Sequence, residues 1–103
     1  MYIVTNRVPV AEGWEEAFET RFRQRAGKIE QQPGFVRMQV LRPRSDNTPY
    51  VVSTTWRDED AFRAWVDSED FRDAHRNPMP KEAFRPEGGG LEQFEVVISA
   101  ESA

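Results

Sequence analysis

The first ten residues alternate between apolar and polar side chains with the two-residue period of a β-strand. The residues that share the apolar side are Tyr2, Val4, Val8 and Val10, and those on the other side are Thr5, Arg7 and Pro9. Asn6 is the exception, because its amide falls on the apolar side. The pattern therefore predicts an N-terminal strand with one polar group on its inward face.

The period changes to that of a helix after Gly13. Apolar residues then recur at helical spacing as far as about Gln32, namely Trp14, Phe18, Phe22, Ala26 and Ile29. The Pro33-Gly34 pair that follows is a strong signal for the end of a helix. We therefore predict one long amphipathic helix from residue 13 to about residue 32.

The rest of the chain holds three more strands and a second helical region. The β-rich runs are Phe35 to Leu41, Tyr50 to Trp56 and Leu91 to Ser99. Asp58 fits the N-cap of a helix, and Ser68 fits the N-cap of a further turn or two that stops at Asn77-Pro78. Residues 77–90 contain three prolines and three consecutive glycines, which predicts a long mobile loop.

This order of elements is the split βαβ of ferredoxin-like folds, in the α+β class. It predicts an antiparallel four-stranded sheet with both helices on one face. A chain of 103 residues has room for a single domain, residues 1–103. Because the helices cover only one face, the apolar residues of the other face need a partner, and a second copy is the simplest supplier. We therefore expect a homodimer, with the sheets combined in a dimeric α/β barrel.

Composition narrows the range of functions. The net charge is −4 and the arginines are interspersed with acidic residues, so no basic stripe is present to neutralise nucleic-acid phosphates. The chain has no cysteine, which excludes thiol nucleophiles and zinc–thiolate sites. The N-terminal residues lack the features of a signal peptide, and no stretch is apolar enough to span a bilayer. We expect a cytoplasmic protein that binds neither nucleic acid nor membrane.

Two arginines interrupt the apolar stripe of the first helix. At about 100° per residue, Arg21 and Arg25 fall near the middle of that stripe rather than opposite it. Their stems could lie along the edge of the core while their guanidinium groups pair with Glu or Asp. The alternative is that the helix faces a cleft that holds an anionic ligand, for which the arginine fork is well suited.

Asn6, Trp65 and His75 also have two interpretations each. Asn6 fits a core amide that bonds to backbone, Trp65 fits an ordinary core residue, and a lone histidine is more often a surface or capping residue than a ligand. His75 is nevertheless the only histidine of the chain, and neutral imidazole is a common ligand of iron. The sequence contains no phosphate-binding glycine fingerprint, GxSxG elbow or HExxH motif that would indicate another chemistry.

Taken together, these three residues resemble a known pattern. Asn6 early in the first strand, Trp65 at the end of Ala61-Phe62-Arg63-Ala64-Trp65 and His75 ten residues later are similar to the Asn–Trp–His triad of IsdG-type haem-degrading monooxygenases. That family lies in the antibiotic biosynthesis monooxygenase superfamily. The resemblance spans nearly the whole chain and includes residues 32–35, 51–56 and 91–97.

The resemblance implies an enzyme, a haem oxygenase, for which haem is both substrate and cofactor. His75 would be the proximal ligand of the iron, and Asn6 would donate a hydrogen bond on the opposite, oxygen-binding face. Trp65 would press on the macrocycle and ruffle it. The axial ligand, the hydrogen-bond donor on the oxygen-binding face and the distortion of the macrocycle are features by which a protein controls haem reactivity. An external electron donor, such as a reductase, would be needed to open the ring and release the iron.

The remaining candidate residues fit the same ligand. Haem would offer an apolar disc to Phe22 and Phe71, and two propionates to Arg21 or Arg25. Two other functions stay open at this point. One is a haem-binding protein without turnover. The other is a cofactor-independent oxygenase of a quinol or polyketide, because many superfamily members share the fold and the Pro-Gly-Phe turn but lack the triad.

Overall fold

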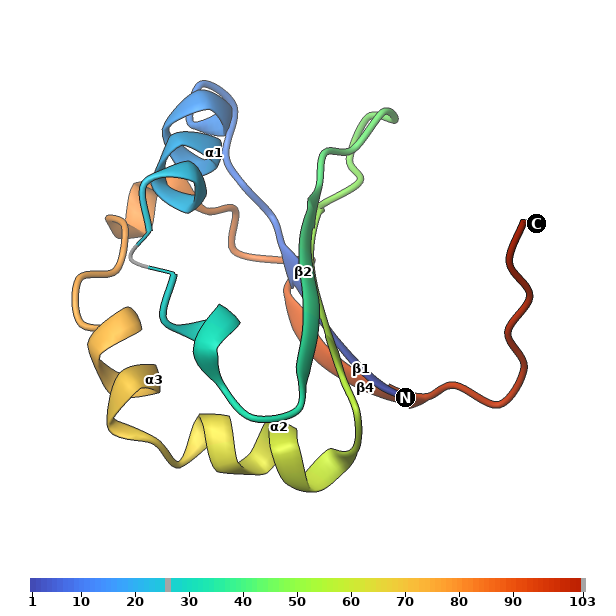
Figure 1. Cartoon of the computed structure of the whole chain (residues 1–103). Coiled ribbons are helices and arrows are strands. Elements are labelled where there is room, and N and C mark those ends of the chain that lie inside the picture. The colour runs from blue at the N-terminus through green and yellow to red at the C-terminus, as the bar shows by residue number, and fades with distance from the viewer. Residues whose placement is uncertain (26, 103) are drawn as a thin grey trace.

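A four-stranded antiparallel sheet forms the frame of the protein. The structure is a computed structural model, and it describes residues 1–25 and 27–102. The strands are β1 (Tyr2–Val8), β2 (Phe35–Leu41), β3 (Tyr50–Trp56) and β4 (Gly90–Glu95), in the order β2-β3-β1-β4. The helices α1 (Glu15–Arg23), α2 (Glu59–Val66) and α3 (Glu69–Ala74) lie on one side of this sheet (Figure 1). The predicted α+β, ferredoxin-like fold is confirmed.

The first helix is shorter than the sequence pattern predicts. α1 ends at Arg23, and a separate 3₁₀ turn, η1 (Ile29–Gln31), follows it. Gly27 adopts a φ of +72°, a left-handed conformation that interrupts a helix and that glycine tolerates best. The prediction of one helix to about residue 32 is therefore wrong. Ala26, which the pattern placed in that helix, lies outside the described residues.

The caps of the second helical region are where the sequence predicts them. Asp58 accepts a hydrogen bond from the backbone N–H of Ala61 at 2.9 Å and begins α2. The Ser68 hydroxyl accepts one from the N–H of Phe71 at 3.1 Å and begins α3. Such caps satisfy backbone donors that the first turn of a helix leaves free. The starts of α2 and α3 are therefore set by these capping side chains.

The turn before β2 requires glycine. Gly34 has a φ of +81°, and a Cβ atom built there would lie 2.5 Å from the Cβ of Ala61 in α2. Any larger residue would push α2 away from the sheet. The carbonyl of Gly34 also accepts a hydrogen bond from the N–H of Arg57 at 2.8 Å. This close approach sets where α2, and hence Trp65, sits against the sheet.

The apolar core is divided into two clusters on the helix side of the sheet. The first cluster contains Val4, Ile29, Trp56 and Trp65, with Tyr2, Phe35, Ala61, Phe62 and Phe71 packed against it. The second contains Val10, Phe18 and Tyr50, with Val8, Trp14, Phe22, Val40, Val52, Met79 and Phe84 packed against it. The middle of β1 lies between the two clusters, because Val4 belongs to one and Val8 to the other.

The segment 77–90 is anchored to the core, so the prediction of a long mobile loop is wrong for its middle part. It contains a 3₁₀ turn, η2 (Lys81–Ala83), in which Ala83 is fully buried. The carbonyl of Ala83 accepts a hydrogen bond from the N–H of Ala11 at 2.7 Å, and the N–H of Arg85 donates to the carbonyl of Pro9, also at 2.7 Å. These bonds tie the segment to the end of β1.

The last strand is also shorter than the sequence predicts. β4 ends at Glu95, and the following segment leaves the sheet on the side opposite to the helices (Figure 1). Within residues 1–25 and 27–102, no helix combines the length and the apolar character needed to cross a membrane.

Candidate functional site

Asn6 lies in the middle of the helix-facing side of the sheet, where no cluster covers it. It pairs with Val52 of β3 and with Leu91 of β4, and it is exposed although Val4 on the same face is buried. Leu91 is also 58% exposed. The interpretation of Asn6 as a buried core amide is therefore wrong. We call this uncovered region, with Asn6 and Leu91 at its centre, the central opening.

Trp65 is a core residue. Its side chain is 4% exposed and belongs to the first cluster together with Ile29 of η1. Its ring meets that of Phe71 edge to face, with the centroids 5.4 Å apart. This confirms the ordinary interpretation of Trp65, while a role for it towards haem stays a prediction.

His75 stands at the C-terminal end of α3 and is held by Phe71. Its Nδ1 lies 2.8 Å from the carbonyl oxygen of Phe71, and the two rings are 4.2 Å apart. A carbonyl oxygen only accepts hydrogen bonds, so Nδ1 carries the proton in this contact. In the neutral imidazole the lone pair is then on Nε2, which is the arrangement that metal-binding histidines usually adopt. His75 is exposed, so Nε2 is accessible.

Arg21 and Arg25 have different surroundings. Arg25 is half-buried: its guanidinium donates to the sulfur of Met38 and lies 5.7 Å from the centre of the Phe22 ring. Burial lowers the pKa of Arg25, and the charge of Glu30 opposes that effect. Arg21 is exposed and lines a surface hollow with Thr20 and Gln24. The prediction that both arginines lie within the apolar stripe is thus wrong for Arg21.

A polar cluster between η1 and α3 was not predicted from the sequence. Lys28 Nζ lies 3.2 Å from Asp73 Oδ2 and 3.8 Å from Asp70 Oδ1, and Gln32 Nε2 lies 3.0 Å from Asp70 Oδ2. The hydrogen bond from Lys28 is the main cause of a lowered pKa at Asp73. The three-residue spacing of Asp70 and Asp73 on one helix face was the only local signal for it.

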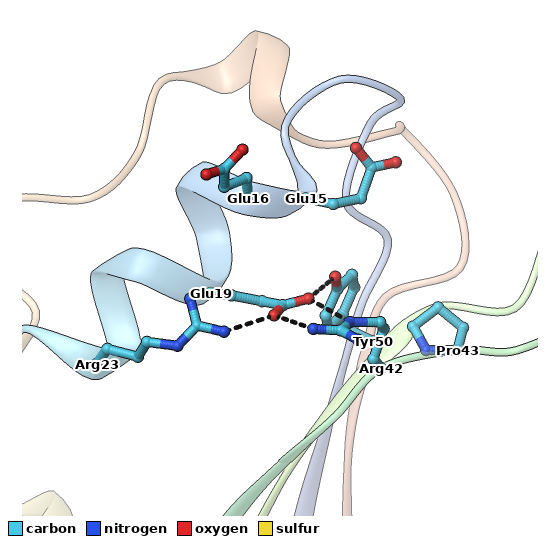
Figure 2. A pocket seen from close by; sticks show the side chains of 7 residues that line it. All are labelled: Glu15, Glu16, Glu19, Arg23, Arg42, Pro43 and Tyr50. Atoms are coloured by element: carbon cyan, nitrogen blue, oxygen red, sulfur yellow. Dashed lines mark hydrogen bonds and ion pairs between the residues drawn. The ribbon is translucent and has the colours of Figure 1, made fainter.

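A second unpredicted network surrounds Glu19 of α1. Its carboxylate accepts hydrogen bonds from Arg42 at 2.6 and 2.7 Å, from Arg23 at 3.0 Å and from the hydroxyl of Tyr50, beside a hollow of about 490 Å³ (Figure 2). The bonds from Arg42 and then Tyr50 lower the pKa of Glu19 to about 2. Each side chain of the network has a partner within it, so we assign the network to stability.

The low pKa of Glu19 predicts an acid-dependent loss of stability. A carboxyl whose folded pKa lies near 2, below its ordinary value of 4.5, stabilises the fold above pH 4.5 and loses that contribution as the pH falls towards 2. Glu19→Gln should therefore lower the unfolding midpoint at pH 7, and its difference from wild type should shrink between pH 4.5 and 2. Urea denaturation at several pH values measures this. Glu12 is an exposed glutamate, so Glu12→Gln should leave the unfolding midpoint close to that of wild type at each of these pH values.

The candidate residues form two groups on either side of Asn6. Trp65, Phe71 and His75 make a continuous chain of ring contacts that starts in the first cluster. Phe22 and Arg25 are in contact beside the second cluster. The central opening lies between the two clusters, because Asn6 stands between Val4 of the first and Val8 of the second.

The chain is similar to known proteins over most of its length. The family model described as antibiotic biosynthesis monooxygenase matches residues 1–77. A mycobilin-producing heme oxygenase of Mycobacterium tuberculosis is 35% identical over 96 residues, which cover 90% of this chain and 86% of the relative. A staphylobilin-producing heme oxygenase of Staphylococcus haemolyticus is 39% identical over 79 residues, 75% of each chain.

Two solved structures share the fold over nearly the whole chain. One is the heme-degrader MhuD of Mycobacterium tuberculosis with two hemes bound in its active site, with a TM-score of 0.80, 32% identity, and coverage of 98% of this chain and 100% of that one. The other is SnoaB of Streptomyces nogalater, a cofactor-independent oxygenase, with a TM-score of 0.70, 29% identity, and coverage of 98% and 97%. The family match covers well over half of the chain, and this chain belongs to the antibiotic biosynthesis monooxygenase family of enzymes.

Proposed function

We propose that the chain is a haem-degrading monooxygenase that binds haem in the central opening. The observation that carries the proposal is His75, whose Nδ1 is occupied by the Phe71 carbonyl so that the lone pair of Nε2 is available to iron. The relatives named heme oxygenase and the haem-bound neighbour support the same substrate. Bound haem supplies the iron that activates oxygen and is itself the compound destroyed, with electrons from an external donor.

The candidate residues fit haem in polarity as well as in ligand chemistry. Phe22 and Phe71 are partly exposed aromatic rings that can pack on a flat apolar disc. No carboxylate of residues 1–25 and 27–102 pairs with Arg25 within 4 Å. Its guanidinium is therefore available to pair with a propionate, to which it would donate hydrogen bonds. Arg21, which is exposed on α1, is the second candidate for a propionate.

Asn6 has the role of a donor in this proposal. Asn6 belongs to strand β1, whereas His75 lies at the C-terminal end of α3, one of the helices that cover the sheet. We propose that Asn6 donates a hydrogen bond on the face of the substrate opposite to His75. Its exposure in this structure means that no core packing must be broken for it to do so.

Trp65 is proposed to act on the shape of the bound ring. Because Trp65 is buried in the first cluster, its position is set by the core, and it contacts Phe71 rather than solvent. We expect Trp65→Phe to keep hemin binding, to slow degradation several-fold, and to destabilise the fold by about 1–2 kcal/mol through lost packing. Single-turnover rates and thermal unfolding measure the two effects. An unchanged rate would argue against any pressure of this ring on the porphyrin.

A cofactor-independent oxygenase is the second candidate function, because SnoaB shares the fold over nearly the whole chain. A titration of the purified chain with hemin separates the two. The haem proposal predicts a Soret band that saturates at a fixed ratio, expected to be one hemin per subunit, or two as in the active site of the MhuD structure. A titration curve that matches hemin in buffer would remove the haem proposal, and also the weaker alternative of a haem carrier without turnover.

We also propose that the chain works as a homodimer through the face of the sheet that carries no helices. That face exposes Leu41 (47%) and Phe94 (49%), and the segment after β4 adds Val97 (83%) and Ile98 (88%). Apolar side chains exposed together in this way mark interaction surfaces. Sedimentation of the wild type should give twice the mass of the chain, and Phe94→Glu should shift it to the monomer. A monomeric wild type would contradict the proposal.

A further inference from the structure

The helix that carries His75 cannot hold its own position. α3 has six residues, and none of them is buried. Helices this short are unstable alone and take their order from packing and caps. The Ser68 cap fixes where α3 begins, and the half-buried ring of Phe71 rests on Trp65. Both contacts lie in the first half of the helix. The C-terminal end is tied to Phe71 through His75 itself, but these contacts join it to no residue outside α3.

Residues 28–32, which include η1, contact both halves of α3, and Lys28 reaches the second half through Asp73. Asp70 and Asp73 lie three residues apart on one helix face, and both point at the segment 28–32. Lys28 Nζ lies within 4 Å of both carboxylates, and Gln32 Nε2 donates to Asp70 at 3.0 Å and to the carbonyl of Lys28 at 3.1 Å. The cluster therefore joins α3 to the segment 28–32 at two positions of the helix, Asp70 and Asp73.

The η1 segment is itself anchored in the core. Ile29 follows Lys28 directly, is 3% exposed, and packs in the same cluster as Trp65. Because Ile29 is fixed in the core, the backbone position of the neighbouring Lys28 is fixed as well. A continuous path of contacts then runs from the core through Ile29 and Lys28 to Asp73, two residues before His75.

We infer that Lys28 and Gln32 are positioning residues, which set the placement of the His75 ring by clamping Asp70 and Asp73. The inference rests on the proposed function, because it concerns the histidine that would bind iron. Neither residue contacts the imidazole, so their effect passes through the backbone of α3. Groups that bond directly to a metal ligand typically change metal affinity about 10–100-fold, so contacts that act through the backbone should have an effect at or below the lower end of that range.

A structural role alone is a weaker explanation of the cluster. Lys28 and Asp70 are more than a third exposed, and pairs with that exposure add little to global stability. Loss of the clamp should therefore leave the unfolding midpoint almost unchanged. Its effect should instead be local, confined to α3 and to whatever His75 binds.

The chain offers a matched control for the test, because it has two lysines, Lys28 and Lys81, and Lys81 is exposed on η2. We would compare Lys28→Met with Lys81→Met in the full chain. In the hemin-free protein, amide hydrogen exchange of residues 71–76 should become about tenfold faster in Lys28→Met only. In the hemin-loaded protein, hemin dissociation should become about tenfold faster, and the iron–histidine stretching band should shift. Lys28→Arg should restore all three.

The outcomes separate the clamp from the function on which it rests. Exchange and dissociation equal to those of Lys81→Met would overturn the inference. Faster exchange with an unchanged dissociation rate and an unchanged iron–histidine band would also overturn it, since α3 would then be held without any effect on His75. A wild type that binds no hemin would defeat the proposed function instead, and the exchange data would still decide whether Lys28 holds α3.

Discussion

Replacement of His75 by alanine should abolish coordinated haem binding. The proposal gives the iron a single protein ligand, so its removal should lower hemin affinity by more than the 10–100-fold typical for outer contacts. The Soret band of any residual complex should match that of hemin without a nitrogen ligand, and degradation should stop. Absorption and electron paramagnetic resonance spectra of the hemin-loaded variant measure this. Because His75 is an exposed helix cap, the fold should survive.

The neighbouring Arg72→Ala variant is the control for this experiment. Arg72 lies on the same short helix and is exposed, so its loss should leave the spectrum of the hemin complex unchanged. A His75→Ala complex with the wild-type spectrum would show that another group binds the iron. Oxygenase activity that persists in His75→Ala without added haem would instead favour the cofactor-independent alternative.

Replacement of Asn6 by alanine should separate binding from turnover. The amide contributes a hydrogen bond on the oxygen-binding side and does not bind iron, so hemin affinity should change by no more than a few-fold. The rate of degradation should fall about a hundredfold, which is the typical cost of removing one preorganised donor from a reacting centre. Single-turnover kinetics under oxygen, beside a hemin titration, give the two numbers.

The Asn6→Asp variant sharpens the same test, because it keeps the shape of the side chain and removes the N–H donor. It should be as slow as Asn6→Ala. A fast Asn6→Asp variant would mean that Asn6 acts through its size or its polarity. Since Asn6 is exposed in this structure, neither variant should lower the unfolding free energy by more than a few tenths of a kcal/mol.

Local rules were sufficient to predict much of the fold. The alternation in β1 predicts which of its residues face the helices, and Asp58 and Ser68 identify the starts of α2 and α3. These features depend on neighbours in the sequence, so they are readable from it. The end of α1 is different. Ile29 sits at helical spacing and is buried, but it reaches the core through a separate turn after Gly27.

The environment of the candidate residues could not be predicted in the same way. The sequence correctly predicts the face of the sheet on which Asn6 lies. Its exposure could not be predicted, because it depends on two clusters that leave the middle of the sheet uncovered. Arg21 and Arg25 look equivalent on a helical wheel, and they differ because α1 ends between them. The pairing of Lys28 with Asp73 spans 45 residues, and no local pattern reports a contact at that distance.

The most direct test of the account is single-turnover degradation of bound hemin. The hemin-loaded chain is mixed with ascorbate in air, with catalase present to remove free peroxide, and the Soret band and chelatable iron are followed together. The account predicts that the band decays, that a bilin-like product forms and that iron is released in proportion. A Soret band that stays constant, without released iron, would contradict it.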